Sequence, residues 1–188
     1  MDTLASGPPT AGETPRLTYE IGRPTIEDIP RLLELYEEQY VLHHEDIDSV
    51  YYAPFTDEVR SAIKADLHAK LQEEEPHVFV ARKEGTIIGF ISFGMGENNY
   101  PDANIKKFGE IKEVLVTDRA RSKRVGDALL EKTEAHFREM GMPYTALECS
   151  ALNERALSFY ARQRYIARQI VHYKSLMLDS DADSSPSG

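Results

Sequence analysis

The sequence predicts a mixed α/β (α+β) domain, in which helices cover the faces of one sheet. Two observations predict this class. β-rich runs and stretches of helical period follow one another in the order β-α-α-β-β-β-α-β-α-β-β, and such an order gives a mixed sheet flanked by helices. The chain has 188 residues, of which 41% are hydrophobic and 29% charged, as expected for a single globular domain with a substantial core.

The first part of the chain supplies one strand and two helices. Residues 17–21 form a short strand candidate. Thr25 and Asp28 belong to a capping-box pattern, which predicts that a helix begins there. A second helix is predicted over residues 57–73, because an apolar residue recurs at every fourth position.

The middle of the chain predicts an antiparallel hairpin followed by another strand. Residues 77–82 and 86–93 are both β-rich, and Gly85 lies between them. A glycine between two β-rich runs favours a tight turn. Residues 108–116 supply the next strand.

The last part of the chain alternates helices with strands. A helix with apolar residues on one face is predicted to begin near Val125. It is predicted to end at Gly141, because glycine often ends helices. Asn153 can cap a short helix that carries Tyr160. Further strands are predicted at residues 144–150, 165–169 and 171–178.

Both ends of the chain have the composition of disordered tails. Residues 1–15 are rich in Gly, Pro, Thr and Ala, and residues 179–188 consist of Asp, Ser, Ala, Pro and Gly. Neither segment can bury enough apolar surface to offset the entropy lost on ordering. The folded domain is therefore expected over residues 16–178.

Charge and composition exclude several classes of protein. The formal net charge is -10, which argues against a nucleic-acid partner, since that affinity comes mostly from an extended basic surface. No apolar run approaches the about 20 residues that span a bilayer, and the first residues do not resemble a secretory signal. We therefore expect no membrane partner and a cytoplasmic location. The single cysteine, Cys149, fits a reducing compartment.

A basic cluster reverses the sign of this charge locally. Arg119, Arg121, Lys123 and Arg124 lie between a predicted strand and a predicted helix. Backbone N–H groups at a helix N-terminus bind phosphate, so the cluster is a candidate anion site. The alternative is a solvated basic turn, because many runs of charged residues simply lie on a solvent-exposed surface.

Two motifs carry a resemblance to a known family. The loop and helix start at residues 116–130 match an Arg/Gln-x-x-Gly-x-Gly/Ala signature at Arg121, Val125 and Gly126. Asn153 and Tyr160 match a second motif, Asn-x-x-Ala-x-x-x-Tyr, at its correct spacing. In this order the two motifs resemble the GCN5-related N-acetyltransferases (GNAT). The resemblance spans residues 17–178 and implies a mostly antiparallel sheet of six to seven strands with about four helices.

The sequence departs from the family pattern at three positions. Arg124 replaces the middle glycine of the loop, and Ser122 stands where many relatives have another glycine. Arg164-Tyr165 replaces a Gly-Phe pair. A glycine lets the backbone approach a phosphate closely, so the side chain of Arg124 is expected to point outward. Altered cofactor geometry is expected more than lost binding.

The resemblance implies acetyl-CoA as co-substrate and a set of residues that bind it. The pantetheine arm is expected to lie along residues 114–116 like an added strand, with an N–H there facing the oxyanion. Lys123, Arg124 or Arg119 are expected to reach the ribose phosphate. Asn153 is expected to contact the cofactor, although it can also simply cap its helix. The implied cofactor-binding residues are Val114, Val116, Arg121, Ser122, Lys123, Arg124, Val125, Gly126, Asp127, Asn153 and Tyr160.

Two residues are predicted to be catalytic. Amine acceptors are mostly protonated near neutral pH, so a base or water relay is needed. Strand alternation puts Glu110 and Glu113 on opposite faces, and the resemblance favours Glu110 as base, although a solvated carboxylate near Lys112 explains it as well. Tyr160 matches the family's general acid, which protonates the departing thiolate; the alternative is a core aromatic.

The acceptor is expected to be a primary amine, attacked directly in a ternary complex. An acidic stretch from Glu37 to Asp48 suggests a cationic acceptor, and a solvated acidic loop is an equal alternative. A nucleophilic role for Cys149 is disfavoured because it has no recognisable catalytic partners. His43 and His44 belong to no metal motif, so no metal is expected.

Other functions stay open on the sequence alone. A non-catalytic acyl-CoA-binding or sensing module with the same fold is the main alternative, and a protein that only retains the fold for interactions is another. Dimers are frequent among relatives, so a homodimer is compatible with the resemblance.

Overall fold

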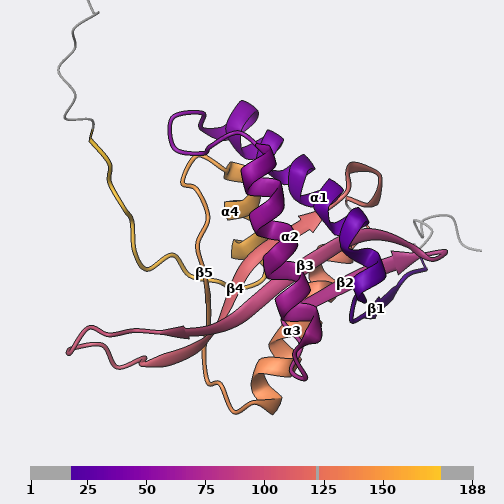
Figure 1. Ribbon diagram of the computed structural model, residues 1–188. Helices are drawn as coiled ribbons and strands as arrows, with labels where there is room; N and C mark the ends of the chain where they lie inside the picture. The colour runs from indigo at the N-terminus through magenta and orange to yellow at the C-terminus, as the bar shows by residue number, and fades with distance from the viewer. Residues whose placement is uncertain (1–17, 122, 175–188) are drawn as a thin grey trace, which may run out of the picture.

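A five-stranded sheet forms the centre of the described chain. A computed structural model describes residues 18–121 and 123–174 (Figure 1). The strand order is β1-β2-β3-β4-β5, antiparallel except for the parallel pair β4 and β5. The strands are β1 (Glu20–Gly22), β2 (Val78–Lys83), β3 (Thr86–Glu97), β4 (Lys107–Val116) and β5 (Thr145–Leu147). The predicted mixed, mostly antiparallel sheet is confirmed, with five strands in the described part instead of six to seven.

Four α-helices flank this sheet. They are α1 (Ile29–Val41), α2 (Asp57–Gln72), α3 (Val125–Glu139) and α4 (Glu154–Arg162), with the short helical turns η1 (Ile26–Asp28), η2 (Leu42–Ile47) and η3 (Asp118–Ala120). The capping box predicted at Thr25 is present, since its N–H donates to Asp28 Oδ2 at 2.7 Å. It opens η1, which leads directly into α1.

The core has two layers, one on each face of the sheet. On one face, α1 and α2 bury Leu32, Leu35 and Leu67 against β2 and β3. On the other, α3 buries Leu129 and Phe137 against the sheet. Figure 1 shows α1 and α2 in front of the sheet and α3 behind it. The apolar stripes seen in the sequence are therefore the buried faces of these helices.

The hairpin predicted around Gly85 is confirmed, and it is a two-residue turn. Lys83 pairs with Thr86, and both Glu84 (φ 51°) and Gly85 (φ 79°) have positive φ. Two consecutive left-handed residues match the right-handed twist of the flanking strands. The turn therefore fixes the register of β2 against β3.

The C-terminal strands predicted at residues 165–169 and 171–178 do not form in the part of the chain that is described. Residues 165–174 have no sheet partner, and 175–178 lie outside the described residues. Ile166, Ile170, Val171 and Tyr173 are all well exposed, so these residues bury too little apolar surface to be held against the sheet. The predicted tails, residues 1–15 and 179–188, also lie outside the described residues.

Candidate active site

β4 leaves its backbone open along its last residues. β5 pairs with β4 only up to Ile111 opposite Leu147. Beyond that point Val116 turns its carbonyl away from β3, where it accepts from Arg121 Nε at 3.1 Å. Because backbone groups alternate along an antiparallel strand, Val114 also points its N–H and C=O away from β3. This free edge can accept an extended ligand as an added strand.

The N-terminus of α3 lies beside this edge. The first bond of the helix runs from the Ala128 N–H to the Arg124 carbonyl, so the N–H groups of Val125, Gly126 and Asp127 have no partner within the helix. Arg124, the N-cap residue, provides no side-chain cap. Unpartnered N–H groups and the helix dipole together favour a phosphate here.

Arg124 occupies the left-handed conformation that a glycine would adopt. Its φ is 61° and its ψ 17°. The side chain lies on the surface, 76% exposed, with Nε 3.2 Å from Asp127 Oδ2, while Tyr19 donates its hydroxyl to the Arg124 carbonyl at 3.1 Å. The loop therefore keeps the backbone path of a glycine loop, and the Arg124 side chain lies at the surface beside Asp127.

The second missing glycine behaves in the same way. Arg164 has a φ of 67° and follows the end of α4. The Tyr165 N–H donates to the Tyr160 carbonyl at 3.0 Å and the Arg164 N–H to that of Ala161 at 3.0 Å, which is a Schellman ending. Both arginines thus carry the strain of a left-handed residue with a Cβ, roughly 1–2 kcal/mol each.

We predict that Arg164→Gly and Arg124→Gly each stabilise the fold. Each substitution relieves the left-handed strain but increases the conformational entropy of the unfolded chain, because glycine is more flexible. The net effect is an increase of about 0.5–1 kcal/mol in the free energy of unfolding. The gain should be larger at Arg164, because Arg124→Gly also removes the contact with Asp127. Urea unfolding measures both. Gly141→Ala places a Cβ at another left-handed position (φ 75°), so this control variant should destabilise the fold. A loss of stability in both arginine variants would contradict the proposal that Arg124 and Arg164 are strained.

α4 contributes Asn153 and Tyr160. Asn153 caps the helix, since its side chain accepts from the Ala156 N–H at 3.0 Å. The Tyr160 ring lies 5.1 Å from that of Phe159 and 5.8 Å from that of Tyr165. Burial, together with the nearby Cys149, raises the pKa of Tyr160 to about 12. Tyr160 is therefore a protonated hydrogen-bond donor throughout the physiological range.

A β-bulge in β4 corrects the predicted facing of its carboxylates. Glu113 pairs with Ser92 and Ile111 with Phe93, so Lys112 is left without a partner. Ile111 packs on the α3 side, which puts Glu110 on the α1 side, and Glu113 also reaches α1. The alternation that separated Glu110 from Glu113 was wrong, because an extra residue reverses the facing of everything after it.

Glu113 is the polar residue of this face that the sequence did not single out. Its Oε2 accepts from the Tyr36 hydroxyl of α1 at 2.5 Å and from the Ser92 hydroxyl of β3 at 2.8 Å. Tyr36 is 3% exposed and Ser92 0%. Burial first, and then the charge of Glu113, raises the pKa of Tyr36 well above its usual range. The only signal in the sequence was the pair of carboxylates itself, because a bulge leaves no pattern of its own.

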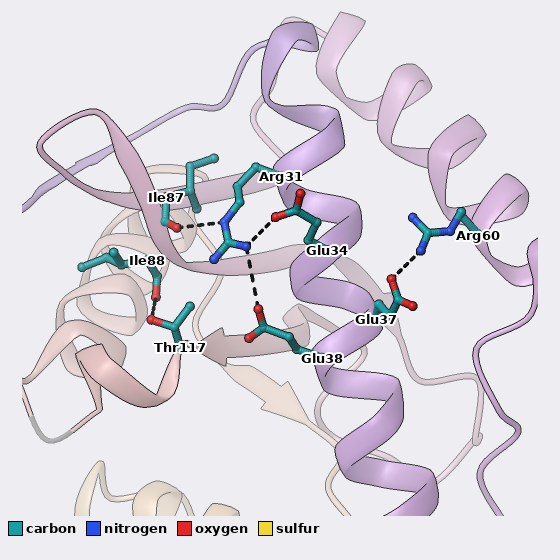
Figure 2. A network of polar contacts seen from close by, with 8 residues as sticks. All are labelled: Arg31, Glu34, Glu37, Glu38, Arg60, Ile87, Ile88 and Thr117. Atoms are coloured by element: carbon teal, nitrogen blue, oxygen red, sulfur yellow. Dashed lines mark hydrogen bonds and ion pairs between the residues drawn. The ribbon is translucent and has the colours of Figure 1, made fainter.

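The acidic stretch before Tyr51 is largely engaged within the protein. Figure 2 shows Glu37 of α1 bonded to Arg60 of α2, and Glu38 held by Arg31 at 3.7 Å. Asp48 accepts from the Tyr51 N–H at 3.2 Å. The Glu37–Arg60 pair joins α1 to α2 and the Glu38–Arg31 pair lies within α1. Asp48 stabilises a turn, so these three carboxylates do not by themselves favour a cationic acceptor.

The two adjacent histidines both meet Tyr52. The ring of His43 stacks on that of Tyr52 at 4.7 Å, and His44 Nδ1 lies 2.7 Å from the Tyr52 carbonyl oxygen. Burial lowers the pKa of His43, and the charge of Glu113 opposes this. Within the described ranges, no three His, Cys, Asp or Glu side chains gather as they would around a metal ion.

The remaining predicted residues lie in the basic turn. Arg119 and Lys123 form no ion pair with any residue the structure describes, whereas Arg121 is paired with Asp118. Ser122 lies outside the described residues. None of the helices described is both long enough and apolar enough to cross a bilayer.

Comparisons with known proteins agree with this geometry. The family model described as "Acetyltransferase (GNAT) family" matches residues 29–165. The aminoalkylphosphonate N-acetyltransferase of Salmonella typhimurium is 30% identical over 126 residues, which cover 64% of this chain and 79% of that protein.

Solved structures show the same fold at low sequence identity. An aminoglycoside acetyltransferase from an uncultured soil metagenomic sample, in complex with sisomicin, has a TM-score of 0.60 at 20% identity and covers 85% of this chain and 97% of its own. The aminoglycoside acetyltransferase AAC(6')-Iy, in complex with a bisubstrate analog of CoA, has a TM-score of 0.65 at 15% identity. The match covers 85% of this chain and 99% of that chain.

Proposed function

Because the chain belongs to the acetyltransferase (GNAT) family of acetyl-CoA-dependent acyltransferases, we propose that it acetylates a primary amine of a small molecule or peptide. The acetyl group moves from acetyl-CoA to the amine by direct attack in a ternary complex. Relatives named for aminoalkylphosphonate and aminoglycoside acetylation support an amine acceptor.

One observation carries the proposal: the free edge of β4 and the unpartnered N–H groups of α3 lie next to each other. Val116 bonds to Arg121 of the loop, and its side chain lies 3.8 Å from the Cβ position of Gly126. A ligand with a phosphate at one end and an amide-containing arm fits this arrangement, since the N–H groups take the phosphate and the strand edge takes the arm. Coenzyme A has both parts.

Val114 would face the reacting carbonyl. Its N–H points away from β3 and can donate to the thioester oxygen, where negative charge grows during attack. The amine nitrogen must lose a proton, and Glu110, partly exposed on the α1 side of β4, is the proposed base. The thiolate leaves toward Tyr160.

Tyr160 acts as a hydrogen-bond donor more than as a full acid. A thiol such as that of cysteine has a pKa of about 8.5, whereas that of Tyr160 is about 12. Complete proton transfer from the phenol to the thiolate would be uphill by about 3.5 pKa units. A hydrogen bond from the phenol still lowers the energy of the departing charge.

An acceptor screen tests the function. The whole chain is incubated with acetyl-CoA and a panel of cationic, neutral and anionic amines, and release of free thiol is followed. We expect turnover that depends on a primary amine, with an N-acetylated product by mass spectrometry. Coenzyme A binding, measured by calorimetry, with no amine-dependent thiol release from any acceptor, would leave only an acyl-CoA-binding role.

A further inference from the structure

The Glu113 carboxylate has no role in the proposed cofactor site. We propose that Glu113 and the aromatic side chains beside it form the acceptor subsite, which binds the ammonium form of an alkylamine. This inference rests on the proposed function and assigns to it a class of acceptor and the residue that selects it.

The carboxylate is fixed in one orientation. Tyr36 and Ser92 come from two different elements and both donate to the same oxygen, Oε2. The hydroxyl groups lie on two of the most buried residues of this face, so they cannot turn away to solvent. Oε1 accepts from no described group, and Glu113 is only partly buried, so this second oxygen is available to a ligand.

No cation among the described residues balances this charge. Among the described residues, no Lys, Arg or His forms an ion pair with Glu113, although Glu37, Glu38 and Asp28 each have an arginine partner. A carboxylate removed from bulk water normally pairs with a cation. A ligand ammonium is the partner that this arrangement lacks.

Aromatic rings border the carboxylate from α1 and the loop after it. Tyr36, Tyr40 and His43 follow one another at positions that share one face of a helix. Burial first, and then the charge of Glu113, raises the pKa of Tyr40, and Tyr40 packs against the core cluster that contains Tyr36. The Tyr40 ring also meets Phe55 edge to face at 5.3 Å. Rings around a carboxylate bind an ammonium and its alkyl chain better than an anion, through cation–π attraction and apolar contact.

The aromatic side chains continue beyond the carboxylate into the segment after α1. His43 stacks on Tyr52. Burial, and to a lesser extent Cys149, raises the pKa of both Tyr52 and Tyr160. On β4, Glu113 precedes Val114, whose N–H points to the free edge. An ammonium on Glu113 is therefore held beside the strand on which the thioester is expected.

The principal test is Glu113→Gln in the full chain. The amide oxygen can still accept from Tyr36 and Ser92, but the charge is gone and an N–H₂ group replaces the second oxygen. For the best alkylamine found in the screen, we expect KM to rise at least ten-fold while kcat stays within about three-fold, as when binding common to the ground and transition states is lost. Glu97→Gln is the matched control: it removes a carboxylate from β3, paired with Lys107 at 3.6 Å, and should leave both constants unchanged.

A binding measurement needs no turnover. Saturation-transfer NMR compares hexylamine, a cation at pH 7, with 1-hexanol on the CoA-loaded protein. We expect hexylamine to bind the wild type and to lose its signal in Glu113→Gln, while Glu97→Gln retains it and hexanol does not distinguish the proteins. Equal hexylamine binding by wild type and Glu113→Gln would overturn the subsite, as would an unchanged KM.

The two proposals fail in different ways. Absence of amine acetylation by the wild type, with hexylamine binding still dependent on Glu113, would refute the function and keep the cation site. Efficient acetylation that Glu113→Gln does not alter would keep the function and refute the site. Thermal unfolding of each variant shows whether a change in KM merely follows a loss of fold.

Discussion

Replacing Tyr160 with phenylalanine should lower kcat about 100-fold, the low end of the range for removing one hydrogen-bond donor to a developing negative charge. The ring and its contacts with Phe159 and Tyr165 at 5.1 and 5.8 Å remain, so the fold of α4 is preserved. Only the hydroxyl, which is proposed to face the departing thiolate, is lost. The dissociation constant of coenzyme A, measured by calorimetry, should change by less than about three-fold, because a hydrogen bond made to developing charge contributes mainly in the transition state.

The pH profile separates this role from an ordinary structural one. Since the pKa of Tyr160 is raised to about 12, its hydroxyl stays protonated at every pH below about 10. Tyr160→Phe should therefore lower kcat by the same factor from pH 6 to pH 10. Tyr165→Phe is the matched control: it removes a hydroxyl bonded to Glu134 of α3 at 3.0 Å, and should retain kcat. Unchanged turnover in Tyr160→Phe would refute the donor role.

Elements with a strong local pattern were predictable from the sequence. The helix over α2 follows from apolar residues at every fourth position, and one of them, Leu67, is fully buried. The β2–β3 hairpin follows from Gly85, which has the positive φ that the turn requires. In both cases the signal and the structure depend on the same few neighbouring residues, so no distant contact was needed to decide between alternatives.

The facing of β4 depends on a distant contact and was not predictable. Strict alternation separates Glu110 from Glu113, and only the pairing of Ser92 with Glu113 shows the extra residue. The bulge is a property of two strands together, whereas the alternation rule uses one. For this reason the sequence directed attention to Glu110, while the buried hydroxyls gather on Glu113.

The two lost glycines show the opposite limit. At Arg124 and Arg164 the residue type argues against a left-handed backbone, yet both adopt it, with φ of 61° and 67°. The surrounding helix start and helix end determine these conformations, and the arginines carry the strain. A motif can therefore survive in the backbone after its glycine has been replaced.

The N-terminus of α3 allows the phosphate site to be tested without disturbing the fold. We expect Gly126→Asp to weaken coenzyme A binding at least about 100-fold. A Cβ at Gly126 lies 3.3 Å from Phe159 of α4 and 3.8 Å from Val116 of β4. Residue 126 belongs to the first turn of α3, so an aspartate there brings a negative charge to the turn whose N–H groups are unpartnered. Like charges about 5 Å apart repel by roughly 3 kcal/mol at an effective dielectric constant near 20.

The variant separates charge from folding because an acidic residue in the first turn of a helix is itself stabilising. Gly126→Ala adds the same Cβ without the charge, and the 3.3 Å contact requires Phe159 to move by only a few tenths of an ångström. We expect the alanine variant to bind within about five-fold of the wild type, because the added methyl group carries no charge and the required shift of Phe159 is small. Calorimetry on both variants, with urea unfolding alongside, gives the comparison. If aspartate and alanine weakened binding equally, the phosphate would lie elsewhere, and the basic turn would be no more than a solvated surface.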